Sequence, residues 1–268
     1  MSKVTKTIPF DRKQIAGNIQ RLIDQGAIFF VSHSGGKDSQ ALYQFITDLV
    51  PHNQIVVIHA HLGEVEWPGV IEHINANISH PLQIARPVYK DGSEKTLLGH
   101  VAKRNQDRPE SPSWPSSAQR WCTSDFKRGP IHKVIRKFCN ELGVDGVNCT
   151  GIRAEESKAR AKLVEFEPCK LLCTQSRTVW EWRPLINWST SQVFKCIEDA
   201  GQEPHPAYAG GNERLSCMFC ILGSENDLRH AARVNPGLAQ KYIDLEHSTG
   251  YTMFHKKSLE SIIASDAK

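Results

Sequence analysis

The residues that most directly suggest chemistry are six consecutive positions, Ser34 to Ser39, with the sequence SGGKDS. They follow an apolar run at 27–31 and precede a segment, 40–50, that has the pattern of a helix. Glycines let backbone N–H groups converge on an anion, and a helix N-terminus adds a partial positive charge. Lys37 supplies a full positive charge at the same point. The segment therefore predicts a phosphate-binding turn, although its spacing is not that of the Walker loop.

A second chemical signal is the pair Cys217 and Cys220, which are separated by two residues. A turn of this kind holds two thiolates at metal-ligand distance, but a metal site needs further ligands. A redox-active dithiol, or two reduced structural cysteines, would show the same spacing. The residues alone leave these three alternatives open.

Composition restricts the class of protein. The chain has 268 residues, 40% hydrophobic and 23% charged, which suits one large α/β domain or a domain with an appendage. The net charge of +4 permits a nucleic-acid partner without arguing for one. No apolar run is long enough to cross a bilayer, and residues 1–6 lack the apolar core of a signal peptide, so we expect a cytoplasmic protein without membrane association. In that reducing compartment, the eight cysteines are expected to bind metal, carry sulfur or be buried rather than form disulfides.

The elements that must position these groups have regular apolar patterns. Apolar strands alternate with amphipathic helices, which indicates a parallel sheet with helices on both faces. We expect strands at 27–31, 54–62, 82–85 and 145–150, helices at 40–50, 70–78, 93–104, 131–142 and 190–200, and an irregular segment at 163–188. Because ligands of such sheets collect at the carboxyl ends of the strands, the phosphate-binding turn is expected to lie in the site.

Three further segments extend this pattern, and each is expected to lead into a helix. They are Cys122-Thr-Ser-Asp-Phe-Lys127, Gly151-Ile-Arg-Ala-Glu-Glu-Ser157 and Trp182-Arg-Pro-Leu-Ile-Asn-Trp188. Together with the Ser34–Ser39 turn, and in this order, they resemble the PP-loop enzymes of the phosphoadenosine phosphosulfate (PAPS) reductase and ATP sulfurylase small-subunit family. The resemblance spans residues 25–225 and is specific at four separated places.

The resemblance implies a Rossmann-like adenine nucleotide α-hydrolase (PP-loop) fold. It implies an ATP pyrophosphatase domain at 1–200, with a C-terminal CxxC loop and helical extension at 201–268 packed on it. ATP and Mg²⁺ would bind, and cleavage between the α and β phosphates would release pyrophosphate. The residues that would bind the nucleotide are Ser34, Gly35, Gly36, Lys37, Asp38, Ser39, Gly151 and Arg153.

Among these residues, Lys37, Asp38 and Arg153 are the expected catalytic groups. Positive groups and Mg²⁺ would stabilise the charge of the departing pyrophosphate more in the transition state than before it. Asp38 could instead cap the following helix, and Arg153 could instead form a salt bridge with Glu155 or Glu156. The sequence leaves both alternatives open.

The resemblance also implies a role for the cysteines. In iron–sulfur members of the family, a cysteine at the position of Cys122 joins a later CxxC around a [4Fe–4S] cluster, so Cys122, Cys217 and Cys220 would be ligands. Thr123 stands where such members often have a second cysteine. The fourth ligand would then be Cys169 or Cys173, or one iron would stay open for sulfur. Zinc, a redox dithiol and structural cysteines stay as alternatives.

The chain departs from the family at the end of the second expected strand. Many relatives have an aspartate there, whereas this chain reads His59-Ala-His61. Glu64 or Glu66 could take over the role of that carboxylate. His59 and His61 point to the same side of a strand and could share a metal, but two histidines alone are too few ligands.

One feature narrows the choice among family members. No cysteine follows Cys220, which disfavours a PAPS reductase, since that enzyme attacks with a cysteine near its C-terminus. The chain then looks most like the ATP pyrophosphatases of DNA phosphorothioation systems (the DndC/SspD group), which work beside a cysteine desulfurase. The implied function is adenylylation of a DNA phosphate followed by sulfur insertion, with Cys122 carrying sulfur if it is not a cluster ligand. A sulfonucleotide-metabolism enzyme and a non-catalytic ATP-binding scaffold subunit are the alternatives, and a homo-oligomer is left open.

Overall fold

Six strands form one sheet in the computed structural model, which describes residues 12–265. Their order across the sheet is β3-β2-β1-β4-β6-β5. The strands are β1 (Ile28–Ser32), β2 (Ile55–Ala60), β3 (Leu82–Ala85), β4 (Gly146–Cys149), β5 (Phe166–Pro168) and β6 (Val179–Trp182). All neighbouring pairs are parallel except β5 and β6. The chain leaves β1 on one side for β2 and returns on its other side as β4, so the carboxyl ends of β1 and β4 form the topological switch point where ligands bind in such sheets.

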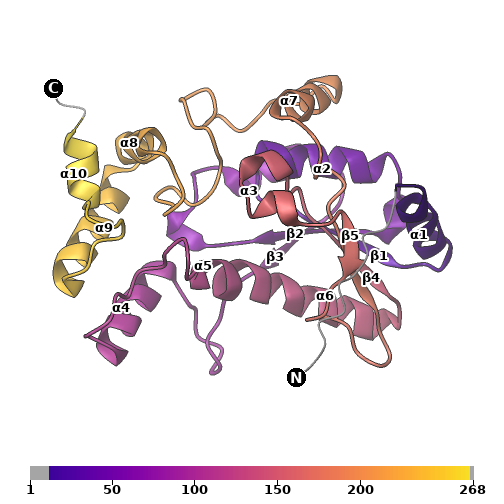
Figure 1. Ribbon diagram of the computed structural model, residues 1–268, viewed down its shortest axis with the longest axis horizontal. Helices are drawn as coiled ribbons and strands as arrows, with labels where there is room; N and C mark the ends of the chain where they lie inside the picture. The colour runs from indigo at the N-terminus through magenta and orange to yellow at the C-terminus, as the bar shows by residue number, and fades with distance from the viewer. Residues whose placement is uncertain (1–11, 266–268) are drawn as a thin grey trace.

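Helices cover both faces of this sheet (Figure 1). One face carries α1 (Arg12–Asp24), α2 (Lys37–Thr47) and α7 (Thr190–Asp199), and the other carries α6 (Gly129–Leu142). Alternate residues of β1 supply both cores, because side chains of a strand point to opposite faces. Phe29 and Val31 pack below α1, α2 and α7, whereas Ile28 and Phe30 pack against α6. The expected α/β fold with helices on both faces is confirmed.

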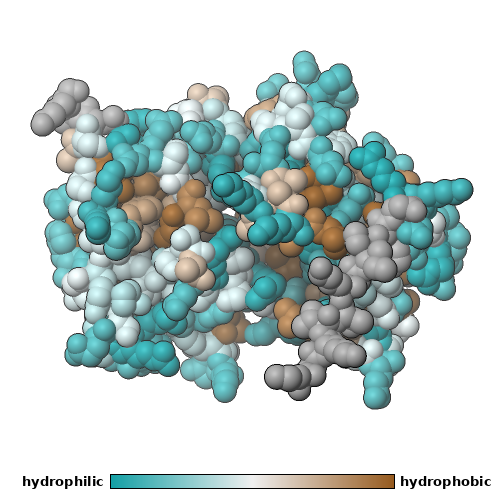
Figure 2. All heavy atoms as spheres, viewed as in Figure 1, coloured by the Kyte–Doolittle hydropathy of each residue, from teal (hydrophilic) through white to brown (hydrophobic). Residues whose placement is uncertain are grey.

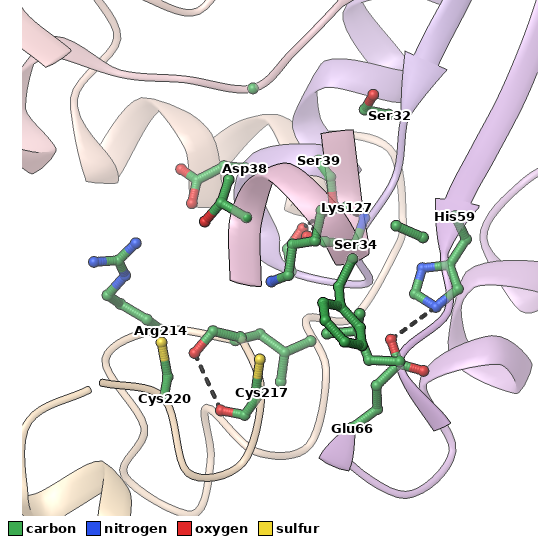
Figure 3. A pocket seen from close by; sticks show the side chains of 18 of the residues that line it. Ser32, Ser34, Asp38, Ser39, His59, Glu66, Lys127, Arg214, Cys217 and Cys220 are labelled. Atoms are coloured by element: carbon green, nitrogen blue, oxygen red, sulfur yellow. Dashed lines mark hydrogen bonds and ion pairs between the residues drawn. The ribbon is translucent and has the colours of Figure 1, made fainter. Parts of the chain in front are cut away.

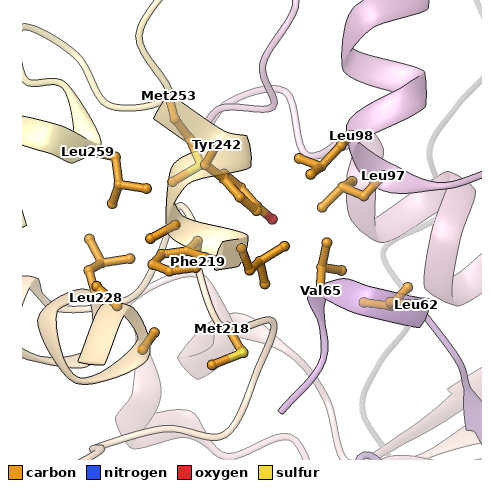
Figure 4. Close-up of a cluster of buried hydrophobic side chains, with 14 of the residues drawn as sticks. Leu62, Val65, Leu97, Leu98, Met218, Phe219, Leu228, Tyr242, Met253 and Leu259 are labelled. Atoms are coloured by element: carbon orange, nitrogen blue, oxygen red, sulfur yellow. The ribbon is translucent and has the colours of Figure 1, made fainter. Parts of the chain in front are cut away.

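The C-terminal helices form a third core at one end of the sheet. These helices are α8 (Glu225–Val234), α9 (Pro236–Thr249) and α10 (Leu259–Ala264), and they pack with α3 (Val70–Ala76) and α4 (Leu97–Asp107). Figure 4 shows Phe219 and Tyr242 in this core, with Val65 contributed by the turn after β2. Shared apolar packing therefore joins the C-terminal extension to the sheet. The division into 1–200 and 201–268 stays a prediction, and residues 1–11 and 266–268 lie outside the described part.

Short helical turns connect these elements. They are η1 (His52–Gln54), η2 (Gly63–Val65), α5 (Trp121–Thr123), the π-helical η3 (Ser124–Arg128), η4 (Ala154–Glu156) and η5 (Arg160–Lys162).

No helix among residues 12–265 has the length and apolar character needed to cross a membrane. Polar side chains cover most of the face shown in Figure 2. The segment 1–6, considered above as a possible leader, is not among the described residues.

Several predicted elements have different ends in the structure, and two strands were missed. Helix α2 begins at Lys37 rather than at residue 40, because the extended backbone of Gly36 forms its N-cap inside the phosphate-binding turn. The segment 163–188, expected to be irregular, contains β5 and β6. The prediction of a helix after Gly151 is wrong. Two short turns, η4 and η5, form there instead, and η4 is closed by the Arg153 N–H, which donates to the Glu156 carboxylate (3.1 Å).

Candidate functional site

The Ser34–Ser39 turn is closed by hydrogen bonds within itself. The Ser39 hydroxyl donates to the Gly36 carbonyl (2.8 Å) and lies 3.1 Å from the Ser34 N–H, which donates to it. Gly35 has a φ of +78°, a conformation that L side chains rarely adopt, and its N–H donates to Nδ1 of His33 (3.1 Å). Burial is the main reason that the pKa of His33 falls to about 3, so the ring stays neutral and Nδ1 stays an acceptor. The turn is therefore preformed at the start of α2.

Asp38 is held between two cations. Arg153 Nε lies 2.6 Å from Asp38 Oδ1, and Lys37 Nζ lies 3.4 Å from Asp38 Oδ2. The buried Arg153 guanidinium also donates to the Glu155 carboxylate, the Trp188 carbonyl (3.2 Å) and the hydroxyl of residue 190 (3.2 Å). All three of its nitrogens are thus engaged. Arg153 fixes Asp38 and the start of α7, and it does not line the cavity described below.

Gly151 is required by a close approach between two backbone segments. A Cβ built on Gly151 would lie 2.5 Å from the Asp38 carbonyl oxygen and 2.9 Å from the Asp38 carbonyl carbon. Real Cβ atoms essentially never come that close to backbone. The absence of a side chain at Gly151 therefore lets the end of β4 meet the start of α2 at the switch point.

A loop from the C-terminal third covers the phosphate-binding turn. The Tyr208 hydroxyl accepts the Lys37 N–H (3.0 Å), and the Lys37 ammonium donates to the Glu213 carbonyl (3.3 Å). Burial raises the pKa of Tyr208 to about 12, so its hydroxyl stays protonated. Lys37 is buried by these contacts and, like Gly35, does not line the cavity. Sequence reasoning missed Tyr208, since a tyrosine in a Pro/Gly-rich loop has no pattern that points to the turn.

A cavity of about 320 Å³ opens at the carboxyl ends of the central strands (Figure 3). This volume lies within the range of small-ligand sites. The phosphate-binding turn contributes Ser34, Gly36, Asp38 and Ser39, and the end of β4 contributes Gly151. Four cationic side chains also line it, namely Arg120, Lys127, Arg160 and Arg214. None of these four was among the expected nucleotide-binding residues, and two of them, Arg160 and Arg214, pair with Glu156, which also lines the cavity.

The predicted metal-binding cysteines line the same cavity, away from the phosphate-binding turn. Cys217 and Cys220 are partly buried, whereas the two residues between them, Met218 and Phe219, are buried in the C-terminal core (Figure 4). The Met218 N–H donates to the carbonyl of Val65 in the turn after β2 (2.9 Å). These anchors hold the CxxC turn so that both thiols face the cavity.

The cysteine thiols differ in acidity. A hydrogen bond from Cys217 lowers the pKa of Cys220 to about 5 against the effect of burial, with help from the Leu222 N–H and the Lys127 ammonium. The pKa of Cys217 is raised by the same hydrogen bond and by burial, and burial also raises the pKa of Cys122. Cys220 is therefore the thiolate at neutral pH, and the thiolate is the nucleophilic form of cysteine.

The arrangement of the three thiols discriminates between metal centres. Thiolates on one zinc ion lie about 3.8 Å apart, but the sulfur atoms of Cys122, Cys217 and Cys220 do not all lie within 4.8 Å of one another. A [4Fe–4S] cluster binds each cysteine through a different iron, so it suits more widely spaced sulfurs. Neither Cys169 nor Cys173 lines the cavity. Among residues 12–265, the three thiols therefore do not have the spacing of a preformed zinc site, and a [4Fe–4S] cluster with three cysteine ligands and one open iron stays a prediction.

A family model for the phosphoadenosine phosphosulfate reductase domain matches residues 28–222. The chain belongs to this PAPS reductase domain family. An uncharacterized 37.8 kDa protein of Escherichia phage 186 is 30% identical over an alignment of 240 residues, and the alignment covers 78% of this chain and 71% of the phage protein. The crystal structure of PAPS reductase from Candida auris in a phosphate complex has a TM-score of 0.50 at 16% identity, covering 80% of this chain and 98% of that one. The structural likeness supports the Rossmann-like fold.

One feature of this family member was only partly anticipated. The sequence left open whether Glu64 or Glu66 supplies a carboxylate near the end of β2. In the structure, Glu66 is the one that lies beside the cavity. The Glu66 carboxylate lies 3.0 Å from His59 Nε2 and 2.6 Å from His61 Nδ1, and it lines the cavity. Glu64 is exposed and pairs with Lys241. His59 and His61 therefore share a carboxylate partner from the following turn.

Proposed function

We propose that this member of the PAPS reductase domain family cleaves ATP between its α and β phosphates and uses the adenylyl group to activate a DNA phosphate for sulfur insertion. The observation that carries the proposal is that the phosphate-binding turn and the three cysteines line a single cavity. Phosphate chemistry and sulfur chemistry would then take place within one enclosed space.

In the first step, a nonbridging oxygen of a DNA phosphate attacks the α phosphorus of ATP. The bond between that phosphorus and the α–β bridging oxygen breaks, and pyrophosphate leaves with the electron pair. Lys127, Arg160 and Arg214 would stabilise the charge that develops on it, in a cavity where such interactions are stronger than in water. Asp38 lines the cavity, and its oxygens keep lone pairs for Mg²⁺ although both contact cations.

In the second step, hydrosulfide attacks the adenylylated DNA phosphorus. A phosphorus–sulfur bond forms, the bond to the AMP oxygen breaks, and AMP leaves with the electron pair while the proton passes to solvent. A cysteine desulfurase would supply the sulfur as a persulfide on Cys220. Attack by the Cys217 thiol on that persulfide releases hydrosulfide and forms a disulfide, which an external dithiol then reduces. If the cysteines hold a [4Fe–4S] cluster instead, its open iron would supply a binding place for sulfide.

A row of cations supports a polymeric anion as the acceptor. Arg120 lines both the cavity and a neighbouring surface hollow, which also contains Arg104 and Arg128. The Arg104 guanidinium lies 5.1 Å from the ring centre of Trp121 in the same hollow. Cations beside an aromatic ring are the groups that bind a nucleic-acid backbone and its bases. The hollow would therefore guide DNA to the cavity mouth.

The test combines Mg–ATP, DNA and sulfide with the purified protein. We expect pyrophosphate release, and phosphorothioate dinucleotides in a nuclease digest examined by mass spectrometry. Asp38→Asn should abolish both, whereas Asp48→Asn, at the exposed C-terminal end of α2, should leave them unchanged. If pyrophosphate appears but no phosphorothioate forms even with a desulfurase present, DNA is not the acceptor. If ATP binds but no pyrophosphate is released, a scaffold role replaces the enzymatic one.

The family match favours a second candidate, a reaction on a sulfonucleotide. The same cavity could hold an adenylyl sulfate with its phosphates on the turn and its sulfate toward Cys220. Incubation with PAPS or adenylyl sulfate and a dithiol would then release sulfite. Sulfite release without ATP or DNA would favour this candidate over the first.

A further inference from the structure

The end of β2 and the turn after it bring together three side chains with metal-binding groups. His59 is a buried residue of β2, His61 follows the strand, and Glu66 follows η2. Their ligating atoms all lie within 4.8 Å of one another. The proposed reaction uses none of the three, although His59 and Glu66 line its cavity (Figure 3).

The hydrogen bond of His59 Nδ1 leaves Nε2 directed at Glu66. His59 Nδ1 lies 2.9 Å from the His33 carbonyl, which can only accept, so Nδ1 carries a proton. His59 Nε2 lies 3.0 Å from a carboxylate oxygen of Glu66. Both this nitrogen and His61 Nδ1 are buried without a hydrogen-bond partner of suitable alignment, although each is at ion-pair distance from Glu66. A cation shared by the three groups would satisfy all of these atoms.

The spacing suits a transition-metal ion with little rearrangement. Nitrogen and oxygen ligands on a tetrahedral zinc ion lie about 3.4 Å apart, compared with the present 3.0 Å and 2.6 Å. Two histidines and one glutamate are a donor set of zinc sites that keep an open position. The His33 carbonyl that orients His59 is the kind of outer partner that metal-bound histidines have.

A second group of similar side chains differs from the first because its polar groups form hydrogen bonds with one another and with a neighbouring amide. His132, Cys169 and Glu181 also approach within 4.8 Å of one another. There, burial and a hydrogen bond to Glu181 raise the pKa of Cys169 to about 12, so the thiol keeps its proton and donates it. The Asn148 amide donates to the same carboxylate (3.1 Å). This cluster does not line the cavity, and its hydrogen bonds account for it without a metal.

We propose that His59, His61 and Glu66 bind one divalent transition-metal ion, with zinc as the matching ion, whose open position faces the cavity. This site is distinct from the cysteines and from the Mg²⁺ expected with ATP. It would place a Lewis acid against an oxygen or sulfur atom held in the cavity. The Lys127 ammonium interacts electrostatically with Glu66, so it would repel a metal ion bound there. An anion bound between these two cations should therefore tighten metal binding.

The experiment measures zinc binding to the full chain after treatment with a chelator, by competition with a chromophoric chelator. Cys217→Ser/Cys220→Ser removes the cysteine pair, and we expect that variant to keep one equivalent of zinc. In that background, Glu66→Gln and His61→Ala should each weaken zinc binding by about 100-fold or more, since even outer partners of metal ligands are worth 10–100-fold. Glu64→Gln, in the same turn but exposed and paired with Lys241, is the matched control and should bind as tightly as its parent.

Cobalt provides a readout that does not depend on the variants. Co²⁺ bound by His59, His61 and Glu66 should give visible bands without the thiolate-to-cobalt absorption that cysteine ligands produce. Unchanged zinc affinity in Glu66→Gln, or loss of all binding in the cysteine variant, would assign the metal to the cysteines and overturn the proposal. Absence of zinc binding to the wild-type chain would also overturn it, because a proton would then satisfy the three groups.

Discussion

Replacing Gly151 by alanine tests the close approach at the switch point. The new Cβ would meet the Asp38 carbonyl oxygen at 2.5 Å, whereas ordinary contacts begin at 3.4 Å, so the end of β4 and the start of α2 must separate by about 0.9 Å. Both neighbours are backbone, so no side chain can rotate away. Overpacking of this kind costs about 1–3 kcal/mol. A displacement near 1 Å can also lower turnover by about 100-fold.

The free energy of unfolding is measured by urea titration, and pyrophosphate release is measured on the folded variant. The matched control is Gly17→Ala, in the exposed middle of α1, where an added Cβ meets nothing within 4 Å. That change should stabilise the protein by about 0.5–1 kcal/mol, because alanine has the higher helix propensity. A Gly151→Ala protein as stable and as active as wild type would show that the two segments can move apart freely, and would refute the role given to this contact.

Three further predictions concern pKa values and buried charge. Burial lowers the pKa of His205 from 6.5 to about 4. The stability that depends on its neutral form is therefore complete above pH 6.5 and is lost as the pH falls toward 4. In urea titrations at pH 5, the free energy of unfolding should fall by about 2 kcal/mol through this group, and the His205→Gln variant should lack that part of the loss. In metal-free protein at pH 6.5, iodoacetamide should alkylate Cys220, with its pKa of about 5, faster than Cys139, whose pKa burial raises to about 11; equal labelling in a peptide map would contradict this order. Buried Glu246 accepts hydrogen bonds from two backbone N–H groups that follow α9, so Glu246→Gln should lower the free energy of unfolding by about 1–3 kcal/mol. The control is Asp244→Asn at an exposed position of α9, and a Glu246→Gln midpoint of unfolding no lower than that of the control would contradict this prediction.

The parallel core of the fold was predictable because its strands are buried on both faces. Such strands appear in the sequence as continuous apolar runs, and β1 and β2 have this pattern; β3 and β4 are shorter, and each contains an amide side chain, Gln83 or Asn148. Strand β6 was missed because its four residues include Glu181, and β5 because it has three residues and ends in a proline. Glu181 is tolerated inside the sheet because the Asn148 amide on β4 donates to its carboxylate. Pairing between neighbouring strands is not visible in the pattern of either strand alone.

The candidate site was predictable where its residues are consecutive. The Ser34–Ser39 turn carries its glycines, cation and acid in one segment, so local chemistry identifies it. Tyr208 and Arg214 lie beside the same turn although they are far from it in the sequence, and no sequence periodicity connects them with it. The role of Arg153 shows the same limit. Its type suggested a phosphate contact, whereas its burial against Asp38 makes it part of the framework.

The cover over the phosphate-binding turn has a consequence for how the chain is made. Synthesis produces β1 and α2 early, but Tyr208 and Glu213, which hold the Lys37 N–H and ammonium, emerge much later. Until then, a nascent chain exposes these donors without their partners, and domains fold as units once their chain is available. A fragment that ends before Tyr208 should therefore bind anions loosely and without selectivity. The complete cavity would form late in translation, when the cysteine turn is also made, so its ends at the Ser34–Ser39 turn and at the cysteines would be completed together.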